Sequence, residues 1–143
     1  MTAAIIIAIE IVRAALPHNQ VTSWLSEFPL PRTIEIRTYQ LKPGMGAEFD
    51  HAMREQSLPM LARWKVDVVA CCPSRHDADS YSLIRAYASL AEREASQEAF
   101  YASAEWREGP RESVLAMIDH YTTLVVDLDD AAIAGLKRLH ATT

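Results

Sequence analysis

The sequence contains few of the residue patterns that bind metals or nucleotides. Its two cysteines are neighbours, Cys71 and Cys72, and neither a CxxC pair nor a Cys/His cluster is present. The five histidines show no HxH or HxxxH spacing. The glycine-rich nucleotide motifs and the GxSxG motif of serine hydrolases are missing as well. We therefore expect no metal site and no cofactor.

Basic residues are also too few and too scattered to form a patch. Lys and Arg number 14 against 19 Asp and Glu, so the net charge is −5. Nucleic acids and anionic membranes are bound through clustered positive charge, so neither is an expected partner. The most apolar segment, Ala3 to Leu16, is too short for a membrane helix and contains Glu10 and Arg13. Adjacent cysteines in a strand point to opposite faces, so reduced thiols and a cytoplasmic location are expected.

Half of the 143 residues are apolar, which is enough for one domain with its own core. We divide the chain into an N-terminal helical extension and linker (1–32), a domain (33–128) and a C-terminal helix (129–143). In the extension, Ile5, Ile9 and Val12 recur at helical spacing before Pro17. This helix either docks on the domain or on a partner chain, or it is upstream sequence read through from a misplaced start. The sequence leaves these alternatives open.

The domain shows the element order β-α-β-β-α-β. Alternating or apolar runs predict strands at 33–41, 66–72, 81–87 and 120–128. An apolar stripe predicts a helix over 47–64 with a kink at Pro59. Ser89 and Glu92 form a capping box that begins the second helix. We expect an α+β, ferredoxin-like fold with both helices on one face of a four-stranded antiparallel sheet. A second copy is expected to cover the other face, giving a homodimer or a higher oligomer.

Several local motifs resemble those of the NIPSNAP family, whose members are dimeric α+β barrels. These are Ile34-Glu-Ile-Arg-Thr-Tyr39 with Leu41-Lys-Pro-Gly44, then Ser57-Leu-Pro-Met-Leu61, and Tyr87-Ala-Ser-Leu-Ala-Glu-Arg-Glu94 running on to Ala99-Phe-Tyr101 and Glu105-Trp106. The resemblance implies a dimeric barrel with an interior cavity and brings no established catalytic residues. Relatives often carry a histidine and an aromatic residue in the third strand, where this chain has Leu83 and Arg85.

The first and third strands supply the candidate ligand-binding residues. If Ile34 and Ile36 pack under the helices, the alternate side chains face the barrel interior. The candidates are then Glu35, Arg37, Tyr39, Tyr81, Arg85 and Tyr87. Such a cavity could hold a polar or anionic small molecule. The alternative is an ion-pair network between Glu35 and Arg37 or Arg85 that fills the cavity and fixes the dimer.

Two functions from different classes follow from these patterns. The first is a non-catalytic dimeric barrel protein that binds a small polar molecule in its interior or acts as an assembly module. The second is a cofactor-independent enzyme of monooxygenase, cyclase or isomerase type. The second rests on analogy with other dimeric α+β barrels, and a shared fold does not establish an activity. The sequence predicts no catalytic residue.

Overall fold

The computed structural model describes residues 30–140, so the predicted N-terminal extension lies outside the described residues except for its last three positions. Four strands form one antiparallel sheet in the order β2-β3-β1-β4. They are β1 (Arg32–Leu41), β2 (Asp67–Pro73), β3 (Ser80–Tyr87) and β4 (Ile118–Leu128). The βαββαβ order and the ferredoxin-like α+β fold predicted from the sequence are confirmed. β4 begins two residues earlier than predicted, immediately after a helix.

The first helical segment is three consecutive helices rather than one helix with a kink. It consists of α3 (Gly46–Ala52), the π-helix η1 (Met53–Ser57) and α4 (Leu58–Arg63). Pro59, at which the sequence predicts a kink, lies in the first turn of α4. A proline ring crowds the carbonyl four residues earlier, here that of Glu55, and that residue lies inside η1. The proline therefore widens the turn that precedes it.

The second helical segment, which begins at the predicted capping box, also contains three helices. They are α5 (Leu90–Ala102), α6 (Ala104–Arg107) and α7 (Arg111–Met117). The Ser89 hydroxyl accepts a hydrogen bond from the Glu92 backbone at 3.1 Å, and the Glu92 carboxylate accepts one from the Ala88 backbone. The hydroxyl and the carboxylate each pair with a backbone N–H that has no partner within the helix, so the predicted capping box is confirmed. Ser103 caps α6 in the same way through the Trp106 backbone N–H at 3.2 Å.

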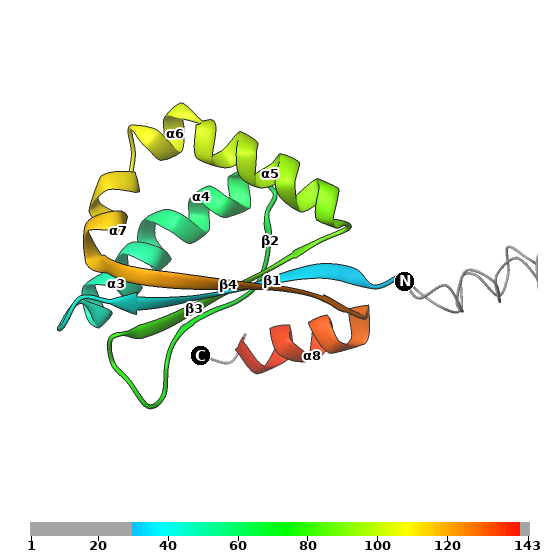
Figure 1. The fold of residues 1–143 in the computed structure, drawn as a ribbon, viewed down its shortest axis with the longest axis horizontal. Coiled ribbons are helices and arrows are strands. Elements are labelled where there is room, and N and C mark those ends of the chain that lie inside the picture. The colour runs from blue at the N-terminus through cyan, green and yellow to red at the C-terminus, as the bar shows by residue number, and fades with distance from the viewer. Residues whose placement is uncertain (1–29, 141–143) are drawn as a thin grey trace, which may run out of the picture. The chain divides into compact units, whose positions relative to one another are not determined.

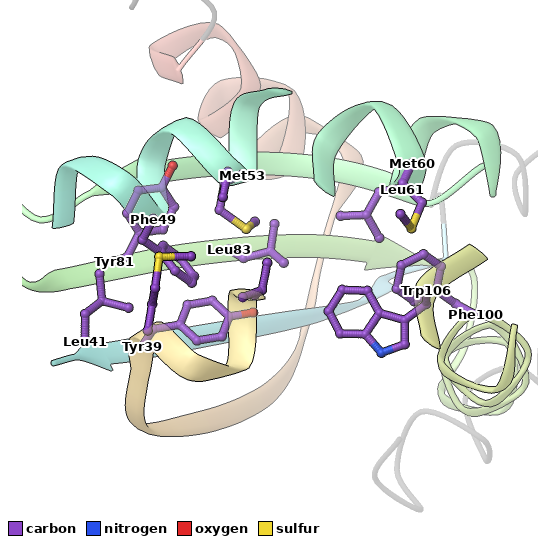
Figure 2. Packing of buried hydrophobic residues seen from close by; sticks show 13 residues of the cluster. Tyr39, Leu41, Phe49, Met53, Met60, Leu61, Tyr81, Leu83, Phe100 and Trp106 are labelled. Carbon is purple, nitrogen blue, oxygen red and sulfur yellow. The ribbon is translucent and has the colours of Figure 1, made fainter. Parts of the chain in front are cut away.

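Helices α3 to α7 lie on one side of the sheet, and α8 (Asp130–His140) lies on the other (Figure 1). The main core is between the sheet and α3 to α7, where Figure 2 shows Tyr39 and Leu83 of the strands beneath Met53 and Leu61. None of the helices in residues 30–140 is both long enough and apolar enough to cross a membrane.

The expected direction of the first strand was wrong. Tyr39 packs against Phe49 of α3 with ring centroids 5.3 Å apart, so the polar side of β1 faces the helices. Ile34 instead lies on the opposite face, in a cluster with Val69, Ala86 and Ile133 of α8. Helix α8 thus covers one end of the face that we expected a second copy to cover. Ile34 is therefore buried without lying under helices α3 to α7.

Helix α8 is attached to the sheet by polar contacts as well as by its apolar side. The carboxylate of Asp129 accepts a hydrogen bond from the Ala132 backbone at 2.7 Å and so caps the helix. The Asp67 carboxylate at the start of β2 forms two ion pairs, with the Lys137 ammonium of α8 at 2.5 Å and with the Arg32 guanidinium of β1 at 2.9 Å. One carboxylate thus links two strands and α8.

Candidate functional site

A buried carboxylate surrounded by three guanidinium groups lies at the centre of the helix-covered face. Glu35 of β1 forms ion pairs with Arg85 of β3, with Arg37 of its own strand at 3.3 Å and with Arg93 of α5. The Arg93 Nε donates to the same carboxylate at 2.6 Å, and the Gln97 amide donates to it too. The side chain of Glu35 is completely buried and that of Arg85 is 1% exposed. Three positive charges therefore face one negative charge.

The position of each group follows from strand register and helix spacing. Glu35 and Arg85 are directly opposite in the β1–β3 pair, so their side chains share one face. Arg93 and Gln97 are four residues apart on α5, which places both on the side of the helix facing the sheet. Burial raises the pKa of Glu35, but Arg85, Gln97 and Arg37 outweigh this effect and lower it to about 2. The carboxylate is thus ionised at neutral pH.

Tyr101 of α5 connects this cluster to a cavity. Its phenol oxygen accepts hydrogen bonds from Arg37 at 3.0 Å and from Arg85 at 3.3 Å. Because both guanidiniums can only donate, the Tyr101 O–H remains available to donate to another group. Arg37 also lies over the ring of Tyr121 of β4, 5.0 Å from its centroid. These contacts hold the Arg37 side chain between Tyr101 of α5 and Tyr121 of the edge strand β4.

The cavity has a volume of about 510 Å³ and lies between β1, β4 and the helices α5 to α7. Its polar lining consists of Arg37, Tyr39, Gln97, Tyr101, Arg111 and Tyr121. Tyr121 is 54% exposed, so the outer rim of the cavity is open to solvent. A smaller cavity of about 40 Å³ lies further inside and shares Tyr101 and Trp106 with the larger one. Together they form a pocket of ligand size with positive charge at its wall.

The six candidates from the sequence do not all belong to this pocket. Glu35, Arg37 and Arg85 form the charged cluster, and Tyr39 is in the cavity wall, where burial raises its pKa to about 12. The Tyr87 phenol lies at the margin of the cluster and accepts a hydrogen bond from Gln97 at 3.4 Å.

Tyr81 lies outside the charged cluster, beneath α3. Its hydroxyl donates to Asp50 at 2.7 Å and accepts from the Cys71 thiol at 3.6 Å. Burial and the bond to Asp50 raise the pKa of Tyr81, so it stays a neutral hydrogen-bond donor. Its contacts are those of a core residue.

Among the polar residues of the charged cluster and the larger cavity, sequence reasoning missed Tyr121 of β4 and four residues on helices: Arg93, Gln97, Tyr101 and Arg111. The available signal was the i, i+4 spacing of Arg93 and Gln97 followed by Tyr101 four residues later. This polar stripe on α5 predicts a polar surface beneath the helix. Arg111 carries no such signal, since it is an exposed residue in the first turn of α7.

A second hollow lies on the opposite face of the sheet, and no Lys, Arg, Asp or Glu side chain lines it. It has a volume of about 540 Å³. The hydroxyls of Thr38 and Thr122 are 2.6 Å apart, and Ser80 donates to Gln40 at 3.0 Å. The pocket beside Arg37 is the stronger candidate site, because guanidinium groups lie in its wall and none lies in the wall of this hollow.

The fold and the pocket together define a ferredoxin-like α+β protein with a charged pocket between sheet and helices. The NIPSNAP family model matches residues 34–126, which is most of the chain, and the protein belongs to the NIPSNAP family. No curated protein matches the sequence. Helix α8 follows the part of the chain that the family model matches.

Solved structures of several bacterial proteins share this fold. A NIPSNAP family protein from Agrobacterium tumefaciens is 15% identical, with a TM-score of 0.65 over 72% of this chain and 90% of that one. An uncharacterized NIPSNAP domain protein from Burkholderia xenovorans is 18% identical, with a TM-score of 0.61 over 68% and 95%. A putative antibiotic biosynthesis monooxygenase from Bordetella bronchiseptica is 19% identical, with a TM-score of 0.56 over 70% and 99%. At these identities the likeness establishes the fold and no activity.

Proposed function

We propose that this NIPSNAP protein binds a small anionic molecule in the pocket between the sheet and α5 to α7. The supporting observation is the charge of the pocket wall, where three guanidiniums are matched by the single carboxylate of Glu35. Of the three, Arg37 also lines the cavity. Arg111 adds another positive charge at the rim. A carboxylate or enolate oxygen can accept hydrogen bonds from Arg37 and from the free O–H of Tyr101.

The pocket also offers an apolar and aromatic body of the size that small ligands require. Trp106 and Val114 line both cavities, and the rings of Tyr101 and Trp106 are 5.6 Å apart. Binding sites of this kind combine mostly apolar walls with a few polar groups that orient the ligand. An aromatic carboxylate is therefore a suitable probe of the pocket.

Two measurements test this proposal. Native mass spectrometry of protein purified gently from its own cells would show whether a small molecule is retained and give its mass. Calorimetric titration would then compare benzoate with benzamide, which has nearly the same shape and no charge. We expect benzoate to bind and benzamide to bind at least tenfold more weakly, because only the anion interacts with Arg37. Equal binding of the two, or no binding of benzoate, would contradict an anion site.

The exposed residue Arg111 provides a variant that leaves the buried cluster intact. Arg111→Gln removes a rim charge without breaking a hydrogen bond or ion pair among residues 30–140. We expect the affinity for benzoate to fall several-fold at low salt and the difference to shrink at high salt, because exposed charges are screened. Arg107→Gln, on the neighbouring helix α6 and outside the cavity lining, serves as the matched control.

We also propose that the protein works as a homodimer through β4. This strand has 11 residues, lies at the edge of the sheet and contains neither Lys nor Pro, which commonly protect such edges. Among residues 30–140, three of the seven exposed large hydrophobic side chains lie on it: Tyr121, Leu124 and Val125. A second copy suits this surface because a two-fold interface pairs a patch with itself. A dimer would also bring a second chain close to the open rim at Tyr121.

Light scattering coupled to size-exclusion chromatography tests the dimer. Leu124 is 58% exposed in the isolated subunit, so Leu124→Lys places a charge in the proposed interface without disturbing the subunit core. We expect a dimer for the native sequence and a monomer for the variant. Leu139→Lys, at a 73% exposed position on α8, should remain dimeric. A monomeric native protein, or a dimeric Leu124→Lys variant, would refute the assignment of this surface.

A cofactor-independent enzyme is the second candidate, and the Tyr101 hydroxyl is the observation that favours it. Its oxygen is engaged by Arg37 and Arg85, so its proton can be donated to an oxyanion that forms in the pocket. Prolonged incubation of the ligand-bound protein in air separates the two functions. A ligand recovered with unchanged mass and unchanged chromatographic retention favours a binding protein, whereas a Tyr101-dependent change in either property favours an enzyme. We further propose a cytoplasmic location, which the free thiols of Cys71 and Cys72 support.

A further inference from the structure

Two buried polar atoms at the inner end of the pocket lack a hydrogen-bond partner among the described residues. They are the Ser57 Oγ and the Arg85 Nε. Ser57 is 6% exposed and Arg85 is 1% exposed, so solvent at the protein surface does not reach them. A buried polar atom without a partner is costly, and most such atoms in folded proteins are satisfied. Both residues line the same inner cavity of about 40 Å³.

The π-helix explains why the Ser57 hydroxyl is free. In a regular α-helix a serine hydroxyl commonly bonds to the carbonyl four residues earlier. Ser57 is the last residue of η1, where the backbone bonds span five residues, and its hydroxyl makes no such bond. Short π-helical segments occur frequently at functional sites. Here the segment places Ser57, with its free hydroxyl, in the wall of the same cavity that Arg85 lines.

The chemistry of the inner cavity favours an uncharged oxygen atom. The surrounding side chains include Met53, Leu61 and Leu83, which cannot solvate a charge. The Arg85 charge is already matched by Glu35 on its other side. The Arg85 Nε and the Ser57 hydroxyl can both donate, and a carbonyl oxygen has two lone pairs to accept them. The cavity volume of about 40 Å³ exceeds the minimum of about 15 Å³ that a single water molecule needs, so the cavity has room for an oxygen atom.

We propose that Ser57 and Arg85 form a subsite for a carbonyl or hydroxyl oxygen of the ligand. This inference rests on the proposed function, because the subsite is the inner end of the same pocket. The ligand would then carry an anionic group near Arg37 and Tyr101 and an uncharged oxygen at its opposite end, with an apolar body between them. Within the class of small anions, the ligands that fit this pocket are then keto or hydroxy acids.

Two benzoates of matched shape test the subsite by calorimetry. The probes are 4-acetylbenzoate, which has a carbonyl oxygen, and 4-isopropylbenzoate, which has a methyl group in its place. We expect the acetyl compound to bind the native protein at least tenfold more tightly, since the isopropyl compound leaves both donors unpaired. In Ser57→Ala this preference should fall to about threefold or less. Ser113→Ala, whose hydroxyl bonds to the Pro110 carbonyl at 2.9 Å outside the pocket, should keep the full preference.

The substitution at Ser57 is suited to this test because it breaks no hydrogen bond within the described residues. Its melting temperature should equal or exceed that of the native protein, so a loss of preference would not reflect unfolding. Native protein that binds benzoate but binds the two probes equally, or binds neither, would overturn the subsite alone. A Ser57→Ala variant with the full preference would do the same. Failure of benzoate itself to bind would overturn both the subsite and the anion pocket.

Discussion

Glu35 and Arg85 face each other across neighbouring strands and form an ion pair from which solvent is excluded. They are partners in the β1–β3 register, and their side chains are 0% and 1% exposed. Removing two charges from water is costly, and such a pair is maintained only where further polar groups complete the solvation. Here Arg93, Gln97 and Tyr101 do so from α5. The cluster therefore holds α5 to the sheet as well as forming the pocket wall.

Removing the central carboxylate should strongly destabilise the fold. Glu35→Gln leaves Arg85 buried without a counter-charge, and breaking one side of a buried pair costs about 3 to 5 kcal/mol. Urea unfolding followed by circular dichroism measures this loss. Glu105→Gln is the matched control, because Glu105 pairs with Arg63 at the surface, where solvent screens an ion pair and its contribution to stability is small. Similar losses in the two variants would contradict the central role of Glu35.

Stability should fall in acid because of the same residue. The pKa of Glu35 is lowered from 4.5 to about 2 in the folded protein, so below pH 4.5 the unfolded chain binds a proton that the folded chain does not. Its contribution is fully present above pH 4.5 and is lost as the pH falls toward 2. A shift of this size corresponds to about 3 kcal/mol.

Urea unfolding between pH 7 and pH 2.5 checks this dependence. Asp50 and Asp67 also have lowered pKa values, because hydrogen bonds to their carboxylates outweigh the effect of burial, so the native curve contains several contributions. The difference between native protein and Glu35→Gln isolates that of Glu35. We expect this difference to be constant near neutral pH and to decrease below pH 4.5. A difference that stays constant to pH 2.5 would show that Glu35 is not the titrating group.

Helix α8 should contribute to stability through a single buried side chain. Ile133 is 3% exposed and packs on Ile34, Val69 and Ala86, whereas Leu139 on the same helix is 73% exposed. We expect Ile133→Ala to cost about 2 to 4 kcal/mol and Leu139→Ala to cost less than about 0.5 kcal/mol. Denaturant unfolding of the two variants measures both. Equal effects would mean that α8 does not pack on the sheet in this way.

Two glycines should respond to alanine in opposite directions. At Gly46 an added methyl group would overlap the carbonyl oxygen of Ala78, which belongs to the backbone and cannot rotate away. We expect Gly46→Ala to lower stability by about 1 to 3 kcal/mol. At Gly135 in α8 the nearest atom is the flexible Arg138 side chain at 3.6 Å. Alanine there should stabilise the helix by about 0.5 to 1 kcal/mol. Differential scanning calorimetry distinguishes the two signs.

The order of the elements was predictable because local signals agree with the final fold. Alternation marks β1, and the hydroxyls of Ser89 and Ser103 and the carboxylate of Asp129 mark helix starts that tertiary contacts do not override. The π-helix was not predictable, because Pro59 indicates an irregularity without fixing its type.

The composition of the site was partly predictable, but its direction was not. Alternation correctly groups Glu35, Arg37 and Tyr39 on one face, since residues two apart in a strand share a side. When helices cover both faces of a sheet, alternation alone does not show which face of β1 lies under α3 to α7 and which lies on the side of α8. The aliphatic residues Ile34 and Ile36 suggest the helix-covered side, yet α8 and the rest of the open face accommodate them. The helical partners of Glu35 depend on tertiary packing that a single strand does not encode.

The π-helix at Met53–Ser57 also bears on how relatives of this protein are compared. A π-turn contains one residue more than an α-turn, and each residue of a regular helix rotates the chain by roughly 100°. Phe49 before this segment and Met60 after it are fixed in the core, so the additional residue is accommodated locally. A relative with one residue fewer between these anchors would have a regular helix and no hydroxyl in the inner cavity. If Ser57 and Arg85 bind the ligand as proposed, we expect a one-residue gap in an alignment of this helix to separate family members with different ligand preferences.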